Sequence, residues 1–495
     1  MSISAKVAQG NAVPRKQMLI DGKWVDARSG KVFPSHDPAT GRHLADLAEA
    51  GRDDVDLAVA AARRAFENPA WARMTPADRQ AILLRFADLI DAHADELTLL
   101  DTLDMGMPIT FSRSRKARLI KSIRYYASLA VTQTGGETVH NSLPGEVFTY
   151  TTREPIGVVA AIMPWNSPLT SSIMKIGPVL ASGCTAVLKP SEEASLVPLR
   201  VGELLAEAGV PPGVINIVTG HGAVVGAALA DHPGVDKIAF TGSRATGQKL
   251  IEASKGNLKR LTLELGGKSP HVVFDDADLE AAVPVAAMAC FQNSGQICSA
   301  GSRLLVQRGI HDEFMRRVAD FARSMVVGSG LDPATQVGPI VSRGQYDRIQ
   351  SYIKKGRELD LTFLAGTDPL DPAVHEGGNF IRPTVIAGVE NAMPIAQEEI
   401  FGPVLVAIPF DGFDDAIRIA NDSEYGLGAG VWTRSASTAH RAARAIRSGT
   451  VWINTYGVLD PAVPFGGFKT SGIGREQGRN QLDAYLEEKS VYLNL

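Results

Sequence analysis

The chain has 495 residues, too many for a single hydrophobic core, and this length indicates two or three domains. The net charge of −4 and the lack of any Lys/Arg block are not those of a nucleic-acid-binding protein, and 45% apolar with 21% charged residues is ordinary for a globular protein. The three cysteines (Cys184, Cys290 and Cys298) form no CxxC pair and the ten histidines no HExxH motif, so we expect neither a disulfide framework nor a metal site.

The N-terminal stretch "MSISAKVAQGNAVPRKQM" has no apolar segment followed by a cleavage site, so we expect no signal peptide. The longest apolar run, near "IGVVAAIMPW", is far shorter than the roughly 18 residues that a membrane helix needs. Together with reduced cysteines, these features predict a cytoplasmic protein.

Further along, Thr75 and Pro76 supply an N-cap and a first-turn proline for a scaffold helix through "ADRQAILLRFADLIDAHADEL".

From Pro155 onward, predicted strands alternate with predicted helices. The strands are "IGVVAAIM", "TAVLKP", "GVINIVTG", "KIAFTGS" and "LKRLTLELGG". This alternation predicts βαβ units and a parallel sheet covered on both faces. Ligands bind such sheets beyond the carboxyl ends of the strands. The most distinctive residues fall at those ends: Asn166, Lys189, Gly220, Gly222, Ser243 and Glu264.

A second alternation begins at "HVVFDD" and continues through "DLEAAVPVAAMACF", "SRLLVQ" and "DEFMRRVADFARSM". It predicts a second α/β domain, with the boundary near Gly266 and Gly267. The segment "GGETVHNSLPGEVFTYTTREP" and the tail "KSVYLNL" favour strands but lie far from either sheet in the sequence. They indicate a small separate β element.

The residues at the strand ends each have a functional and a structural interpretation. "TGHGAVVG" has GxGxxxG spacing and is a weak cofactor signal alone, whereas "FTGSRATG" offers N–H groups and the Ser243 hydroxyl to a phosphate. Lys189 and Glu192 in "LKPSE" either bind ribose hydroxyls or are solvated. Glu264 is either a general base with a raised pKa or a capping or ion-paired carboxylate. Asn166 either donates to an oxyanion or stabilises a turn.

Cys298 lies in "FQNSGQICSAGSR", among small residues. Most cysteines are buried apolar thiols, and Cys184 and Cys290 fit that description. The small, loop-like neighbours of Cys298 indicate access to a cleft instead, and no metal-ligand spacing surrounds it. A nucleophile and a buried thiol are therefore the two interpretations that the residues leave open.

Seven stretches resemble the signatures of one family, in that family's order. They are "MPWNSP", "LKPSE", "FTGS", "LELGGKSP", "FQNSGQICSAGSR", "EEIFGPV" and "PFGGFKTSGIGRE", and they span about residues 163 to 476. The spacing of 34 residues from Glu264 to Cys298 is also similar to the family's. On these grounds the chain resembles the NAD(P)-dependent aldehyde dehydrogenase superfamily.

The resemblance implies roles for matching residues. Cys298 resembles the nucleophile that attacks the aldehyde to give a thiohemiacetal, and the Asn166 amide with the Cys298 N–H resembles the oxyanion hole. After hydride transfer, Glu264 resembles the base that activates water to hydrolyse the thioester, with Glu476 assisting. The positions that resemble the family's cofactor site are Ile162, Pro164, Trp165, Lys189, Glu192, Gly222, Ser243, Glu399 and Phe401. Glu192 favours NAD over NADP, because a carboxylate accepts from the 2′-OH but repels a 2′-phosphate.

The family fold implies two parallel-sheet α/β domains and a β oligomerisation element. We expect a Rossmann-like NAD-binding domain at 1–133 and 156–267, a catalytic domain at 268–482, and the oligomerisation element at 134–155 and 483–495. The strands of that element pair between subunits in the family, so a homodimer or homotetramer is expected.

The substrate tunnel is where the chain departs from its relatives, since Ser167 stands where many of them carry an aromatic residue. The other expected wall residues are Thr170, Met174, Ile297, Ser299, Leu459 and Phe465. None of these is Arg or Lys, so a neutral and fairly bulky aldehyde is expected. Three alternatives remain. A CoA-acylating aldehyde dehydrogenase would not need Glu264, and a cysteine hydrolase would need a histidine, which no matched motif contains. The third is a crystallin-like structural protein.

Overall fold

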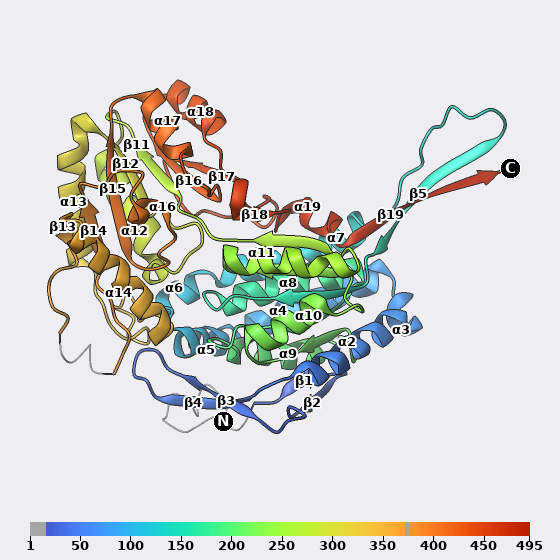
Figure 1. Cartoon of the computed structure of the whole chain (residues 1–495). Helices are drawn as coiled ribbons and strands as arrows, with labels where there is room; N and C mark the ends of the chain where they lie inside the picture. Colours follow the sequence, from blue (N-terminus) through green and yellow to red (C-terminus); the bar gives the residue numbers. More distant parts are fainter. Residues whose placement is uncertain (1–15, 372–376) are drawn as a thin grey trace.

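The computed structural model describes residues 16–371 and 377–495. The first fifteen residues of the expected NAD-binding domain, and most of the segment considered for a signal peptide, therefore lie outside the described residues. Among the described helices, none is long and apolar enough to cross a membrane. Two α/β lobes and a projecting arm make up the described chain (Figure 1).

The first lobe contains an eight-stranded sheet whose five central strands run parallel. From edge to edge its strands are β18 (Gly472–Ile473), β10 (Arg260–Glu264), β9 (Lys237–Thr241), β6 (Val158–Ile162), β7 (Thr185–Lys189), β8 (Ile215–Ile217), β1 (Met18–Ile20) and β2 (Lys23–Val25). Every residue of β6 and β7 is buried, as expected for strands covered on both faces.

Helices pack on both faces of this sheet through apolar side chains. One face carries α4 (Pro76–Ala92), α7 (Lys116–Thr132), α8 (Pro168–Ser182) and α9 (Leu196–Glu207). The other carries α2 (Arg52–Glu67), α10 (Ala227–Asp231) and α11 (Arg244–Ala253). The short helices α3 (Pro69–Ala72), α5 (Ala94–Met105), α6 (Ile109–Ser114) and η1 (Gly222–Gly226) connect them. Helix α8 begins at Pro168 and ends at Gly183, whose φ of 88° suits glycine.

The second lobe contains a seven-stranded sheet that is parallel except for β13. Its order is β13 (Thr362–Ala365), β14 (Thr384–Ala387), β15 (Val404–Phe410), β12 (Arg303–Gln307), β11 (Pro270–Val273), β16 (Gly428–Trp432) and β17 (Thr450–Ile453). Helices α12 (Leu279–Phe291) and α13 (His311–Ser324) cover one face. The other face packs against α14 (Arg343–Glu358), α16 (Pro394–Gln397), α17 (Phe413–Asn421) and α18 (Ala436–Ala445).

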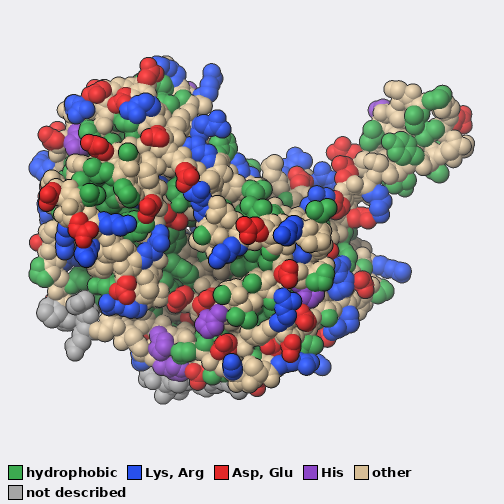
Figure 2. Space-filling view, in the orientation of Figure 1, with side chains coloured by type: hydrophobic (Ala, Val, Ile, Leu, Met, Phe, Trp, Pro, Cys, Tyr) green, Lys and Arg blue, Asp and Glu red, His purple; other side chains and the backbone are tan. Residues whose placement is uncertain are grey.

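The arm consists of β5 (Val147–Pro155) and β19 (Leu486–Asn494), paired antiparallel along their whole length. It extends away from both lobes in Figure 1, after α19 (Gly478–Asp483). Its tip presents apolar side chains in Figure 2, and Phe148, Tyr492 and Leu493 are 42%, 68% and 48% exposed. This arm is the separate β element that the sequence predicts.

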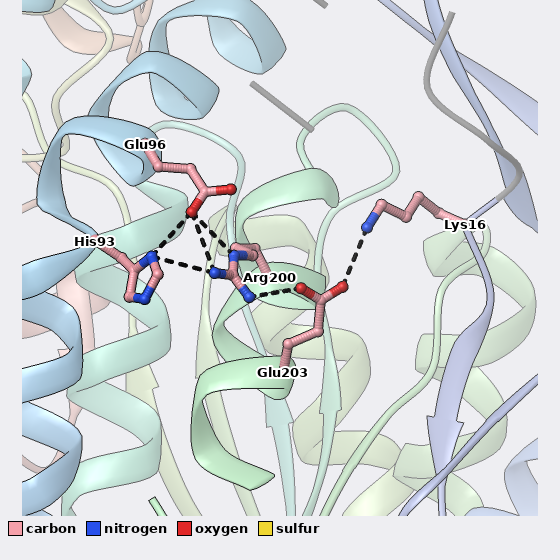
Figure 3. A network of polar contacts seen from close by, with 5 residues as sticks. All are labelled: Lys16, His93, Glu96, Arg200 and Glu203. Atoms are coloured by element: carbon pink, nitrogen blue, oxygen red, sulfur yellow. Dashed lines mark hydrogen bonds and ion pairs between the residues drawn. The ribbon is translucent and has the colours of Figure 1, made fainter. Parts of the chain in front are cut away.

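A partly buried ionic network holds the helices of the first lobe together. Arg200 of α9 bridges Glu96 of α5 and Glu203 of its own helix, and the same Glu96 carboxylate contacts His93 (Figure 3). Lys16, just before β1, reaches Glu203 at 3.3 Å. The network therefore joins the start of the described chain to α5 and α9.

The expected fold class, two parallel-sheet α/β units with a small β element, is confirmed. Three details differ from the sequence analysis. The N-terminal region adds β1, β2 and a hairpin of β3 (Val32–His36) and β4 (His43–Ala48), short elements that show little periodicity. The expected long helix after Pro76 breaks at His93, where the backbone leaves the helical region. Strand β18, from the expected catalytic range, pairs with β10 of the first sheet.

Candidate active site

A cavity of about 590 Å³ lies where the two lobes meet. Its lining includes Asn166, Glu264, Cys298, Glu399 and Phe401. Asn166 follows β6, Glu264 ends β10, and Cys298 follows α12. The fold thus brings together, from separate elements, the three residues that the sequence analysis marked for chemistry.

The loop that carries Cys298 is held in an unusual backbone conformation. Asn293 and Ser294 have φ angles of 51° and 57°, a region that costs free energy for residues other than glycine. The Asn293 amide donates to the backbone oxygens of Asn166 and Gln296, and the Gln296 side chain accepts from Val341 N at 3.0 Å. These bonds fix the loop against the segment that carries Asn166.

Cys298 is the partly exposed cysteine, whereas Cys184 and Cys290 are fully buried. Burial, with the charges of Glu399 and Glu264, raises the pKa of the Cys298 thiol to about 12. The Asn166 side-chain amide donates to the Gln296 carbonyl at 2.9 Å. This contact places the amide two residues before the cysteine, on the same cavity wall.

Glu264 is 4% exposed, and neither of its carboxyl oxygens has a hydrogen-bond partner among the described residues. Burial, and then the charge of Glu476, raise the pKa of Glu264 well above its usual value, against the opposing charges of Lys175 and Arg475. Glu476 itself forms a buried ion pair with Lys175. Glu476 therefore lies near Glu264, although it does not line the cavity.

A second cavity of about 1080 Å³ adjoins the first and shares Pro164, Trp165 and Ser243 with it. It runs along the carboxyl ends of the parallel strands and is also lined by Ile162, Lys189, Glu192 and Gly222. All nine residues expected to hold the cofactor thus line one cavity or the other.

The carboxylate of Glu192 is held in place within the second cavity. Lys189 Nζ lies 2.9 Å from Glu192 Oε2, and Gly222 N donates to Oε1 at 3.2 Å. Burial raises the pKa of Glu192, but Lys189 and the backbone hydrogen bonds, including that of Gly222, together bring it below the usual value. Near the first cavity, Gly267 N donates to Glu399 at 3.1 Å, and Phe401 packs edge-on against Trp165.

The comparisons with known proteins agree with this arrangement. The family model "Aldehyde dehydrogenase family" matches residues 24–491. A mitochondrial aldehyde dehydrogenase of Arabidopsis thaliana, family 2 member B4, is 45% identical over 484 residues, which cover 97% of this chain and 88% of the relative. The chain belongs to the aldehyde dehydrogenase family. The resemblance noted in the sequence is thereby confirmed.

Solved structures of aldehyde dehydrogenases are also similar to this chain over nearly its whole length. The NAD+ complex of the aldehyde dehydrogenase from Bacillus cereus has a TM-score of 0.95 and 42% identity, covering 100% of this chain and 99% of that one. A betaine aldehyde dehydrogenase from Staphylococcus aureus, in complex with NAD+, has a TM-score of 0.95 and 38% identity, covering 97% and 94%.

The seven residues expected in the substrate tunnel of this aldehyde dehydrogenase line neither of the two cavities. Several of them make contacts that place them, among them Met174, whose carbonyl accepts from Gln481 at 3.0 Å, and Phe465, which exchanges backbone hydrogen bonds with Glu476. Ser299 O accepts from Tyr456 Oη at 2.7 Å, and Thr170 Oγ1 accepts from the Arg115 guanidinium. The seven positions remain predictions for the tunnel: Ser167, Thr170, Met174, Ile297, Ser299, Leu459 and Phe465.

Sequence reasoning missed Arg115, Lys175 and Tyr456. Arg115 and Lys175 lie at or in helices, and Tyr456 lies in the loop after β17, outside any of the motifs considered in the sequence. Lys175 carries a signal in hindsight, because a lysine in the apolar helix "PLTSSIMKIGPVLAS" is rarely buried without a carboxylate partner. Nothing in the sequence around Arg115 or Tyr456 indicates their contacts.

Proposed function

We propose that this enzyme, an oxidoreductase acting on aldehydes, oxidises an aldehyde to the carboxylic acid through Cys298 and uses NAD. The observation that carries the proposal is the cavity that Cys298, Asn166 and Glu264 line together, next to a second cavity built around Glu192. The relatives solved with NAD+ support the choice of cofactor.

In this mechanism, Cys298 Sγ attacks the carbonyl carbon while the Asn166 amide and the Cys298 N–H stabilise the oxyanion. With a pKa of about 12, the thiol has to lose its proton as the complex forms, and the carboxylates in the same cavity, Glu264 and Glu399, are the candidate acceptors. Loss of hydride from the thiohemiacetal gives the thioester, and the proton taken from the thiol is released to solvent. Glu264, again ionised, then takes a proton from the water that hydrolyses the thioester. Glu476, next to Glu264, assists by receiving that proton in turn.

The residues of the second cavity fit a dinucleotide. The fixed Glu192 carboxylate suits ribose hydroxyls, and the first turn of α11 presents backbone N–H groups suited to a phosphate. Ser243 Oγ, however, accepts from Thr246 N as the cap of that helix. NAD, when bound, supplies the hydride acceptor. The negative charge of Glu192 favours NAD over NADP.

The CoA-acylating alternative is less well supported, because acyl transfer to CoA does not need a carboxylate such as Glu264 beside the cysteine. A crystallin-like protein without activity would not need the buried Glu264 with its raised pKa.

We further propose that the arm mediates a homodimer or homotetramer, on the strength of its exposed apolar side chains, and that the enzyme is cytoplasmic. A bulky substrate follows from Ser167.

The test is NADH formation from a panel of aldehydes with NAD and with NADP. We expect NADH with the wild-type enzyme and a loss of at least about a thousandfold in kcat for Cys298→Ala, because the nucleophile is removed. The fully buried Cys184 provides the control, Cys184→Ala, which should keep activity. Activity that survives Cys298→Ala would refute the proposed function.

A further inference from the structure

Arg115, the residue before α7, holds its guanidinium against the predicted substrate tunnel. Its Nη2 donates to Thr170 Oγ1, in the first turn of α8 and four residues after Asn166. Its Nη1 lies 3.4 Å from Met107 Sδ, and its buried Nε has no partner among the described residues. A guanidinium has more N–H donors than these contacts use.

Arg118 lies one turn further along α7, and its partly buried guanidinium makes no hydrogen bond or ion pair with the described residues. Lys121, another turn on, forms an ion pair of 2.5 Å with Asp460. Asp460 adjoins the predicted wall residue Leu459. Arg118 is thus three residues from Arg115 and three from Lys121, so that it neighbours each of them along the helix. It lies between the contact to Thr170 and the contact beside Leu459.

The positive charges of Arg115 and Arg118 are not balanced by nearby carboxylates among the described residues. Burial, and the repulsion between the two groups, lower the pKa of Arg115, and burial lowers that of Arg118. The nearest acidic group, Asp101, is engaged elsewhere, because it accepts from Ser112 Oγ at 3.3 Å and Leu169 N at 3.4 Å. Burial raises the pKa of Asp101 to about 6, so this carboxyl supplies one negative charge at neutral pH and loses it in mild acid. Two partly buried guanidinium groups face at most one carboxylate.

We propose that Arg115 and Arg118 bind an oxyanionic group at the far end of the substrate, so that the enzyme prefers aldehydes that carry a carboxylate or a phosphate. Planar guanidinium groups bind both through paired charge-assisted hydrogen bonds. The inference rests on the proposed oxidation by Cys298, which acts on the other end of the molecule. It replaces the neutral substrate expected from the wall residues, since neither arginine is one of them.

The test uses the full-length enzyme with saturating NAD and four related aldehydes. These are 4-formylbenzoate, its uncharged methyl ester, 4-formylphenyl phosphate and benzaldehyde. We expect a kcat/KM for 4-formylbenzoate or the phosphate that is roughly tenfold or more above that of the ester, because a charge-assisted hydrogen bond contributes about that factor. Whichever anion is favoured identifies the group.

Variants locate the effect. Arg118→Met should bring the ratio of kcat/KM for the anionic aldehyde to kcat/KM for the uncharged ester close to one. Arg118→Lys should restore part of the preference for the anion. Arg115 also packs over Phe111, so Arg118, which has no hydrogen-bond or ion-pair partner among the described residues, provides the decisive variant. Arg124→Met is the matched control, because Arg124 is on the same helix but pairs with Asp88.

The outcomes separate the two proposals. NADH formation with no preference for the anions, or a preference that Arg118→Met leaves unchanged, overturns the arginine site while the proposed function stands. No NADH from any aldehyde overturns both.

Discussion

The cofactor cleft and the substrate side of Cys298 are built from different kinds of structure. The cleft is formed at the carboxyl ends of the parallel strands β6, β7, β9 and β10. Each of these strands is followed by a short turn with a recognisable sequence motif. The substrate side is approached by α7, the first turn of α8 and the loop around Leu459, which are far apart in the sequence. A cleft at strand ends can be read from local motifs, whereas walls made by packed helices cannot.

The largest effect on the cleft side is expected for Glu264→Gln. Steady-state turnover should fall by roughly a hundredfold to ten-thousandfold, because water loses its general base. The first turnover should persist as a rapid burst of NADH, since thioester formation comes before hydrolysis. Stopped-flow absorbance measures the burst and the steady state in one experiment.

The pH dependence follows from the same residue. Glu264 must be deprotonated to act as a base, and because burial raises its pKa, the active form is lost as the pH falls through that raised pKa. The wild-type steady-state rate should therefore rise with pH, and Glu264→Gln should remove that limb. Glu252→Gln, on the exposed surface of α11, is the control. Unchanged turnover in Glu264→Gln would show that another group activates water.

A smaller effect is expected for Glu192→Gln at the other end of the cleft. The ratio of kcat/KM for NADP to that for NAD should increase by roughly tenfold, because the negative charge that opposes a 2′-phosphate is removed. The exposed neighbour Glu193 does not line the cavity, and Glu193→Gln should leave the ratio as it is. An unchanged ratio in Glu192→Gln would mean that this carboxylate does not face the 2′ position.

The residues that line the two cavities could be expected from local sequence, whereas the contacts around the predicted tunnel could not, for physical reasons. Glu264 ends strand β10 and Glu192 comes three residues after β7, so their place in space is set by local structure. Arg115 contacts Thr170 across 55 residues of sequence, through the packing of α7 on α8, and no local pattern encodes that packing. The sequence shows that Ser167 differs from the family pattern. It does not show that the Arg115 guanidinium contacts Thr170, three residues further along.

The smallest effect is expected behind Cys298, where Tyr456 supports the catalytic loop from a side that no motif describes. Its hydroxyl donates to Ser299 O at 2.7 Å, and its ring stacks on His271 with centroids 4.9 Å apart. Burial lowers the pKa of His271 to about 3, so the stacked ring stays uncharged at any working pH. The hydroxyl is therefore the polar link from this stack to Ser299, the residue after Cys298.

Tyr456→Phe keeps the stacked ring and removes only that hydrogen bond. We expect kcat and the rate of Cys298 alkylation by iodoacetamide to fall by roughly twofold to tenfold, the effect of one neutral hydrogen bond. The KM for NAD should not change, because the cleft residues lie on other elements, and the exposed Tyr492 gives the matched control Tyr492→Phe. Alkylation at the wild-type rate in Tyr456→Phe would mean that the bonds of Asn293 and Gln296 alone hold the loop. A fall in both rates would instead make the wall behind Cys298 part of what positions the thiol.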